Sequence, residues 1–267
     1  MKIKDAFENR KAFITFITCG DPNLETTEKL IVTMEKNGAD IVELGIPFSD
    51  PTAEGPVIQA ANIRALSGGV TTDKIFDMVR RVRPKVNIPL VFMTYANVVF
   101  SYGIERFAKA CSDIGINGII LPDVPFEEKH EFSDIFDGMG VEFISLVAPT
   151  SDDRTTKIAE QAKGFLYCVS SLGVTGTRTS ISDSISEIVS KAKEVSNVPA
   201  AVGFGISTPE QAAHIAQYAD GIIIGSAIVK LIGKYGENSE EPVGEFCRSI
   251  RAVMRPQADT RSNFLIV

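Results

Sequence analysis

The feature that most constrains the fold is a regular alternation of short apolar runs with longer amphipathic segments along the chain. Eight of the runs are continuous and rich in β-branched or aromatic residues, which is typical of parallel strands buried on both faces. The expected strands are Ala12–Ile17, Ile41–Gly45, Leu90–Thr94, Gly118–Leu121, Glu142–Val147, Phe165–Val169, Ala200–Gly203 and Gly221–Ile224. Eight successive strand–helix units favour an α/β fold closed into a (β/α)8 TIM barrel rather than an open sheet.

The segments between the strands carry helical periodicity with recognisable ends. Gly38 and Gly115 are expected to follow two of the helices as C-terminal caps. Pro84 would end a third helix before the next strand. Ser207, with Glu210 three residues later, predicts a capping box that opens the helix after the seventh strand. The helices expected from these patterns include Leu24–Asn37, Thr72–Val82, Ile104–Ile114 and Phe126–Phe136.

Length and composition limit the class of protein further. The 267 residues suit a barrel of about 250 residues, and no linker or low-complexity tract interrupts them, so a single domain over residues 1–267 is expected. Hydrophobic residues make up 44% of the chain, enough for a large core. The net charge of −7 argues against general nucleic-acid binding. No apolar run approaches the roughly 20 residues of a membrane span, and the charged N-terminus does not resemble a secretory signal.

The four cysteines lie far apart in the sequence, with no C-x-x-C pair and no nearby histidine. This spacing fits neither a zinc site nor a disulfide framework, so buried reduced thiols, no metal and a cytoplasmic protein are expected. His130 and His214 fall in expected outer helices, which argues against a catalytic histidine.

The active site of such a barrel is built at the C-terminal ends of its strands. Two glycine-rich stretches, at residues 203–207 and 225–227, follow the seventh and eighth expected strands. Backbone N–H groups around Gly205, Gly225 and Ser226 suit a phosphate, because no side chain blocks the approach of the anion. One such stretch alone is usually only a turn; two at these positions favour phosphate-binding loops.

Glu43 stands between Val42 and Leu44 on an expected buried strand, where a carboxylate is costly unless it is paired or protonated. One interpretation is a structural glutamate bonded to backbone or a hydroxyl. The other is a carboxyl group with a raised pKa that acts as a general acid. Asp50 and Glu54 in the following loop add carboxylates near the mouth and suggest acid–base chemistry by two carboxyl groups.

The segment after the sixth strand is rich in glycine and threonine, and either a mobile lid or an ordinary surface loop fits this composition. Tyr95 and Tyr167 lie near strand ends. Their hydroxyls could line the mouth, or both could be buried structural tyrosines.

Taken in order, these segments resemble the tryptophan synthase alpha chain family, and the resemblance extends over nearly the whole sequence. It is carried by residues 43–51 (ELGIPFSDP) with 55–59 (GPVIQ), 16–22 (FITCGDP), 93–97 (MTYAN), 121–125 (LPDVP), 173–176 (GVTG) and both phosphate-loop stretches.

The resemblance implies a retro-aldol cleavage of indole-3-glycerol phosphate to indole and glyceraldehyde 3-phosphate, with no cofactor in this chain. It makes Glu43 the general acid that protonates the indole ring at C3, and Glu54 the second carboxylate, facing the indole N–H. Tyr167 matches a position close to the reacting centre, and Thr175 lies in the lid. The positions matching the apolar walls are Phe16, Ile58, Met93, Ile120 and Phe204, with Tyr95 as a further substrate-binding candidate; those matching the phosphate cradle are Gly176, Gly205, Gly225 and Ser226.

One position departs from the family pattern: Glu54 stands where aspartate is usual. The added methylene moves the carboxylate by up to ~1 Å, a misplacement that can cost about 10²-fold in rate. Either the loop compensates or the chain is slower than its relatives.

The resemblance also implies a beta-chain partner that depends on pyridoxal phosphate, in an alpha2beta2 assembly whose interface lies near Asp50, Pro51 and Asn97. Two alternatives stay open: a free-standing indole-glycerol phosphate lyase, and a weakly catalytic subunit that acts mainly as an allosteric activator of beta.

Overall fold

The computed structural model describes residues 1–148, 152–169, 178–203 and 205–254. Its described strands are β1 Ala12–Thr18, β2 Ile41–Gly45, β3 Leu90–Met93, β4 Gly118–Ile120, β5 Glu142–Phe143, β6 Ser145–Val147, β7 Leu166–Val169, β8 Ala200–Gly203 and β9 Gly221–Ile224. Its described α-helices are α1 Leu24–Lys36, α2 Pro56–Ser67, α3 Thr72–Val82, α4 Ala96–Tyr102, α5 Ile104–Asp113, α6 His130–Gly138, α7 Asp152–Glu160, α8 Arg178–Val195, α9 Pro209–Ile215, α10 Ser226–Tyr235 and α11 Glu240–Val253. Short 3-10 helices are η1 Ile3–Phe7, η2 Arg83–Lys85, η3 Phe126–Glu128 and η4 Gly236–Asn238.

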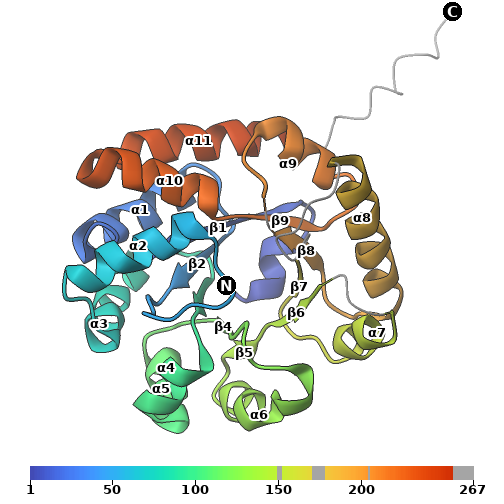
Figure 1. Cartoon of the computed structure of the whole chain (residues 1–267), viewed down its shortest axis with the longest axis horizontal. Coiled ribbons are helices and arrows are strands. Elements are labelled where there is room, and N and C mark those ends of the chain that lie inside the picture. The colour runs from blue at the N-terminus through green and yellow to red at the C-terminus, as the bar shows by residue number, and fades with distance from the viewer. Residues whose placement is uncertain (149–151, 170–177, 204, 255–267) are drawn as a thin grey trace, which may run out of the picture.

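The strands form one parallel sheet in the order β5-β4-β3-β2-β1-β9-β8-β7-β6. Its two edge strands, β5 and β6, are the halves of the single fifth strand expected from the sequence, separated only by Ile144. Continuity of the chain through this residue closes the sheet on itself, and the helices surround it (Figure 1). The predicted (β/α)8 TIM barrel is confirmed.

Apolar residues fill two layers, one inside the barrel and one between the strands and the helices. Alternation along each strand separates them: Ile41 faces the interior cluster, whereas Val42 and Leu44 pack in the outer layer. Because both faces of the sheet are covered, the strands are buried along nearly their whole length, as their continuous apolar runs predicted.

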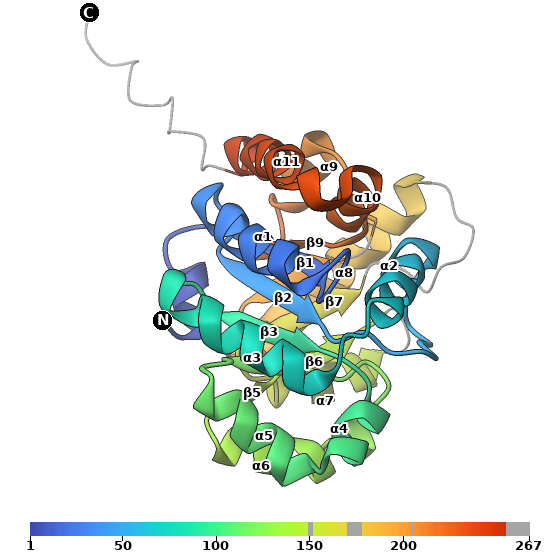
Figure 2. The ribbon, with the colours of Figure 1, turned by 90° about the vertical axis from the view of Figure 1, so that its left-hand side faces the viewer.

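The N-terminal 3-10 helix η1 seals the end of the barrel at which the strands begin, an element that the strand pattern did not predict. Ile3 and Ala6 are fully buried in the interior cluster. A Cβ on Gly118 would come within 2.9 Å of Ile3 Cδ1, and one on Gly221 within 2.9 Å of Phe7 Cε1, so side chains there would displace η1. Figure 2 shows the N-terminus and helix α2 at opposite ends of the barrel. A ligand that reaches the interior would therefore enter from the α2 end.

Helix ends agree with several of the expected caps. Gly38 and Gly115 have positive φ values of 103° and 76°, as predicted for C-terminal glycines. The predicted capping box at Ser207 and Glu210 is wrong by one residue, because Thr208 caps α9 with Gln211. The helix predicted at Phe126–Phe136 is also wrong as one element, since the chain forms η3 and then begins α6 after Lys129.

The cysteines are buried free thiols, as predicted. His130 and His214 lie in α6 and α9, also as predicted. In the part of the chain that the structure describes, no helix is long and apolar enough to cross a membrane.

Candidate active site

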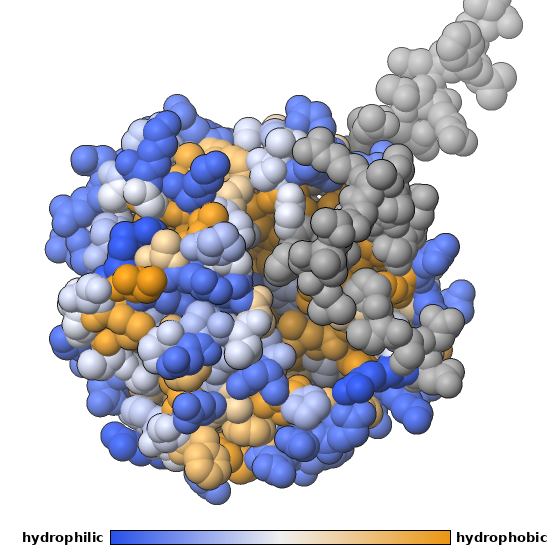
Figure 3. All heavy atoms as spheres, in the orientation of Figure 1, coloured by the Kyte–Doolittle hydropathy of each residue, from blue (hydrophilic) through white to orange (hydrophobic). Residues whose placement is uncertain are grey.

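A cavity of about 900 Å³ opens at the C-terminal ends of the strands. The predicted site residues Glu54, Met93 and Tyr167 line it. Figure 3 views this end of the molecule, where the surface is hollowed near its centre and apolar side chains lie along the hollow. An apolar cavity with few polar groups suits an aromatic ligand.

Glu43 lies in the interior of the barrel on β2, in register with Phe16 on β1 and Val91 on β3. Its side chain is fully buried, and among the described residues neither carboxylate oxygen has a hydrogen-bond partner. Burial without a partner raises the pKa of Glu43 to about 8. The structural alternative, a carboxylate bonded to backbone or a hydroxyl, therefore finds no support in the described contacts.

Tyr167 on β7 faces the same interior and is 8% exposed. Its pKa is raised well above the usual value, first by burial and then by the charge of the Glu43 carboxylate nearby. A Cβ on Gly203 would come within 2.6 Å of Tyr167 Oη, so glycine at the end of β8 leaves the space for this ring. The two residues that the sequence placed on separate strands thus meet within the barrel.

Glu54 lies in the loop between β2 and α2, where Asn62 Nδ2 on α2 donates a 2.6 Å hydrogen bond to Glu54 Oε2. The pKa of Glu54 is raised by burial, while hydrogen bonds from Asn62 and Tyr95 act in the opposite direction. Tyr95 Oη also accepts a 3.1 Å hydrogen bond from the Ala53 backbone N–H. Two side chains therefore hold this loop and its longer carboxylate, and sequence reasoning missed Asn62 because a lone amide on a helix carries no distinctive pattern.

The other expected wall residues pack against the cavity lining rather than line it themselves. Phe16 and Ile58 form one buried cluster with Met93. Ile120 packs in the interior cluster with Tyr167. The Phe16 ring lies against Gly45, where a Cβ would meet its Cζ at 2.6 Å. Glycine at this position therefore leaves the space that the Phe16 ring occupies.

The two phosphate-loop stretches follow the neighbouring strands β8 and β9. Gly205 has a φ of 76°, which favours glycine, and a Cβ there would meet nothing within 4 Å. Gly225 is the N-cap of α10, and Ser226 is its first residue, so the free N–H groups of a ten-residue helix begin here. Such a helix N-terminus suits an anion. Gly176, Thr175 and Phe204 lie outside the described residues.

Several lining residues were not expected from the sequence, among them Leu121, Val124, Phe126, Lys129 and Arg154. The first two follow β4 at the mouth, where the strand-end rule alone would have found them. In the sequence, Lys129 and Arg154 look like ordinary charged residues on the solvent-exposed face of a helix, so no pattern marks them as site residues.

The chain resembles known proteins both in sequence and in structure. Residues 3–255 match the family model described as "Tryptophan synthase alpha chain". A tryptophan synthase alpha chain from Lacticaseibacillus casei is 47% identical over 253 residues, covering 95% of each chain. The crystal structure of tryptophan synthase subunit alpha from Legionella pneumophila superposes with a TM-score of 0.86 at 37% identity, covering 95% of this chain and 98% of that one. A structure of the tryptophan synthase a2b2 complex from Pyrococcus furiosus gives a TM-score of 0.85 at 33% identity, covering 91% and 98%.

Proposed function

The chain belongs to the tryptophan synthase alpha chain family, a lyase subunit that cleaves indole-3-glycerol phosphate, and from this premise we propose that Glu43 and Glu54 are its two reacting carboxyl groups. The observation that carries the proposal is the environment of Glu43, a fully buried carboxyl group without a described partner and with a pKa of about 8. A carboxyl group of this kind is protonated near neutral pH and has a proton to give.

In the proposed mechanism, Glu43 protonates C3 of the indole ring and is left as a carboxylate. This carboxylate then accepts the proton of the hydroxyl on the glycerol carbon bonded to C3. That carbon becomes the aldehyde carbonyl as its bond to C3 breaks, and the electron pair of the bond returns to the indole ring. The ring nitrogen carries the developing positive charge, which the Glu54 carboxylate stabilises through the indole N–H. Asn62 and Tyr95 position Glu54 for this contact. Tyr167 lines the cavity near Glu43, and we expect its ring to lie close to the reacting carbon.

The remaining pocket residues divide between the ring and the phosphate. Met93 lines the cavity, and Phe16, Ile58 and Ile120 pack behind this lining, so that together they support the apolar walls for the indole. Gly205, Gly225 and Ser226 supply backbone N–H groups for the phosphate at the N-terminus of α10. An acidic chain binds an anion most readily through such local donors.

The proposed partner is a tryptophan synthase beta chain, because the Pyrococcus furiosus relative is described in an a2b2 complex. We expect the contact near Asp50, Pro51 and Asn97, where Asp50 and Asn97 are exposed. Phe100, on the same helix as Asn97, is 71% exposed, which is unusual for a large apolar side chain and suits a protein contact. Pyridoxal phosphate is assigned to that beta chain and no cofactor to this one. A cytoplasmic location is proposed from the buried free thiols.

The test is indole release from indole-3-glycerol phosphate by the wild type and Glu43→Gln, each with and without a related beta chain. We expect wild-type turnover to rise with beta and Glu43→Gln to lose about 10³-fold, the usual scale of general acid catalysis. Glu245→Gln, an exposed glutamate on α11, is the matched control and should keep full activity.

The two alternatives give different results in the same assay. A free-standing lyase would show turnover that beta does not change. A regulatory subunit would release no indole in either form, yet would still activate beta when Glu43 is replaced.

A further inference from the structure

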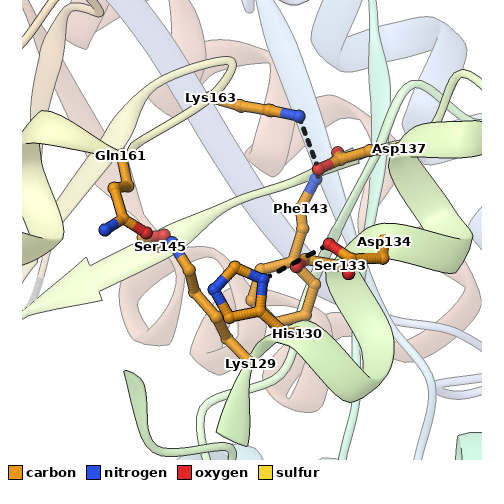
Figure 4. A pocket seen from close by; sticks show the side chains of 9 residues that line it. All are labelled: Lys129, His130, Ser133, Asp134, Asp137, Phe143, Ser145, Gln161 and Lys163. Atoms are coloured by element: carbon orange, nitrogen blue, oxygen red, sulfur yellow. Dashed lines mark hydrogen bonds and ion pairs between the residues drawn. The ribbon is translucent and has the colours of Figure 1, made fainter. Parts of the chain in front are cut away.

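A second cavity, of about 240 Å³, lies between α6 and the strands β5 and β6. Figure 4 shows the side chains that line it, from α6 and its start on one side and from residues 143–163 on the other. Lys129, Phe143 and Ser145 also line the larger cavity of the candidate active site. The two spaces therefore adjoin at Lys129.

Lys129 is only 6% exposed, which is rare for a lysine. No hydrogen bond or ion pair joins its ammonium group to another residue in the described ranges of the chain. Its Nζ lies 4.6 Å from the centre of the Phe126 ring, a contact that attracts a cation without neutralising it. Burial lowers the pKa of Lys129, as expected when a charge has lost part of its water.

The charged groups around Lys129 are engaged with one another. Asp137 pairs with Lys163 at 2.8 Å, and Asp134 contacts His130 Nδ1 at 3.3 Å. On the side of the larger cavity, Arg154 pairs with Glu127 at 2.9 Å. The contacts of Asp137 with Lys163 and of Asp134 with His130 appear as dashed lines in Figure 4. Lys163 and Arg154 thus each have a carboxylate partner. The Lys129 ammonium, among the described residues, has no carboxylate within ion-pair distance.

Two hydroxyl groups complete the wall. Ser133 on α6 and Ser145 on β6 are each 6% exposed, and both residues line the cavity. No hydrogen bond links either hydroxyl to another described residue. Lys129, Ser133 and Ser145, all more than nine-tenths buried, therefore line the same cavity, and each has a hydrogen-bond donor without a described partner.

We propose that the second cavity binds a small oxyanion of the phosphate class, held by the Lys129 ammonium and the hydroxyls of Ser133 and Ser145. An ammonium group binds phosphate as a point charge, and hydroxyl donors orient the oxygens. The volume exceeds what a single water needs, so an anion with part of its hydration fits. This site is separate from the loops after β8 and β9, and it does not depend on the proposed reaction.

The first test is crystallographic, with selenate as the probe because its selenium scatters anomalously. Crystals of the full chain are soaked in selenate for the wild type, Lys129→Met and Lys29→Met. We expect an anomalous peak beside Lys129 Nζ in the wild type and in Lys29→Met, where the replaced lysine is exposed on α1 and paired with Glu25. The peak should be absent from Lys129→Met, while any peak at the α10 N-terminus stays in all three.

The second test is in solution and separates sources of the anion. Inorganic phosphate and glycerol 3-phosphate are titrated against the wild type, Lys129→Met, Lys129→Arg and Ser145→Ala while the melting temperature is followed. Ligand binding stabilises by an amount set by ligand concentration relative to Kd. We expect the phosphate-dependent shift to shrink in Lys129→Met, to fall partly in Ser145→Ala and to be retained in Lys129→Arg. The part of the shift that Lys129→Met removes reports on the second cavity, and a larger such part with glycerol 3-phosphate than with phosphate would identify an organic ester as the preferred occupant.

Three outcomes would overturn the proposal. One is the absence of selenate at Lys129 under conditions that fill another anion site. Another is a peak that persists in Lys129→Met. The third is an equal phosphate-dependent shift in the wild type and Lys129→Met, which would reduce the crystal peak to binding at soaking concentration only.

Discussion

Glu43 and Glu54 are the same residue type, eleven positions apart, yet their surroundings are opposite. Glu43 is fixed on a strand inside the barrel, with no hydrogen-bond partner among the described residues. Glu54 lies on a loop and accepts a hydrogen bond from Asn62. The comparison teaches that the fold separates identical groups through their partners: burial raises the pKa of both carboxyl groups, but only Glu54 has hydrogen-bond donors that act against this shift.

The largest expected effect concerns the pH dependence of stability. The pKa of Glu43 is near 4.5 in the unfolded chain and about 8 in the fold, so the folded state keeps a proton that the unfolded state loses. Wild-type stability should therefore fall as pH rises from about 4.5 to about 8, by roughly 3 kcal/mol at pH 7. Glu43→Gln has no such proton. From pH 4.5 to pH 7, its free energy of unfolding should therefore rise by roughly 3 kcal/mol relative to that of the wild type.

Urea unfolding of both proteins at half-unit steps from pH 4.5 to pH 8.5 measures this difference. Every other titrating group contributes equally to the two curves. If the free energies of unfolding of the two proteins changed in parallel with pH, Glu43 would have an ordinary pKa in the fold. The contrast drawn between Glu43 and Glu54 would then be wrong.

The next effect comes from shortening each carboxylate by the same methylene. Glu43→Asp should lose about 10²-fold in indole release, because a rigid strand cannot follow a shift of ~1 Å. Glu54→Asp should change the rate by less than about tenfold, since the loop can move and Asn62 stays available. Steady-state rates of the two variants check this order, and a larger loss at residue 54 would contradict it.

The smallest effect is expected at Asn62. Asn62→Ala removes the 2.6 Å hydrogen bond to Glu54 and should lower kcat/KM about tenfold, the value of a hydrogen bond to a charged group. The loss should appear mainly in kcat, because the carboxylate acts on charge that develops during the reaction. Asn238→Ala, at an exposed asparagine in η4, is the control and should behave as the wild type. A loss confined to KM would show that Asn62 only shapes the pocket.

Much of the fold was predictable because buried parallel strands leave continuous apolar runs in the sequence. The split of the fifth strand at Ile144 was not, since an isoleucine interrupts no apolar run. The capping error at Ser207 arose because two adjacent pairs satisfy the same pattern. Pro209 at the first helical position would have selected Thr208 as the cap.

The site was predictable where a residue violated its local pattern. A carboxyl group between Val42 and Leu44 is conspicuous on a buried strand, and the fold places Glu43 in the interior as expected. Lys129 gave no such signal, because a lysine at the start of an amphipathic helix usually faces water. Its burial follows from the packing of α6 against β5, a contact between elements that local sequence patterns do not encode.

Helix η1 has a consequence for synthesis. Residues 3–7 leave the ribosome before every strand of the barrel, yet the interior cluster that buries them includes Phe165 and Ile223, and Phe7 lies against Gly221. Contacts across such long sequence separations form only after the intervening chain has been ordered. Strand β1 likewise waits for β9 as its second neighbour. The residues of η1 are therefore translated before the strands but are among the last to be buried, and the barrel closes only after β9 has been translated.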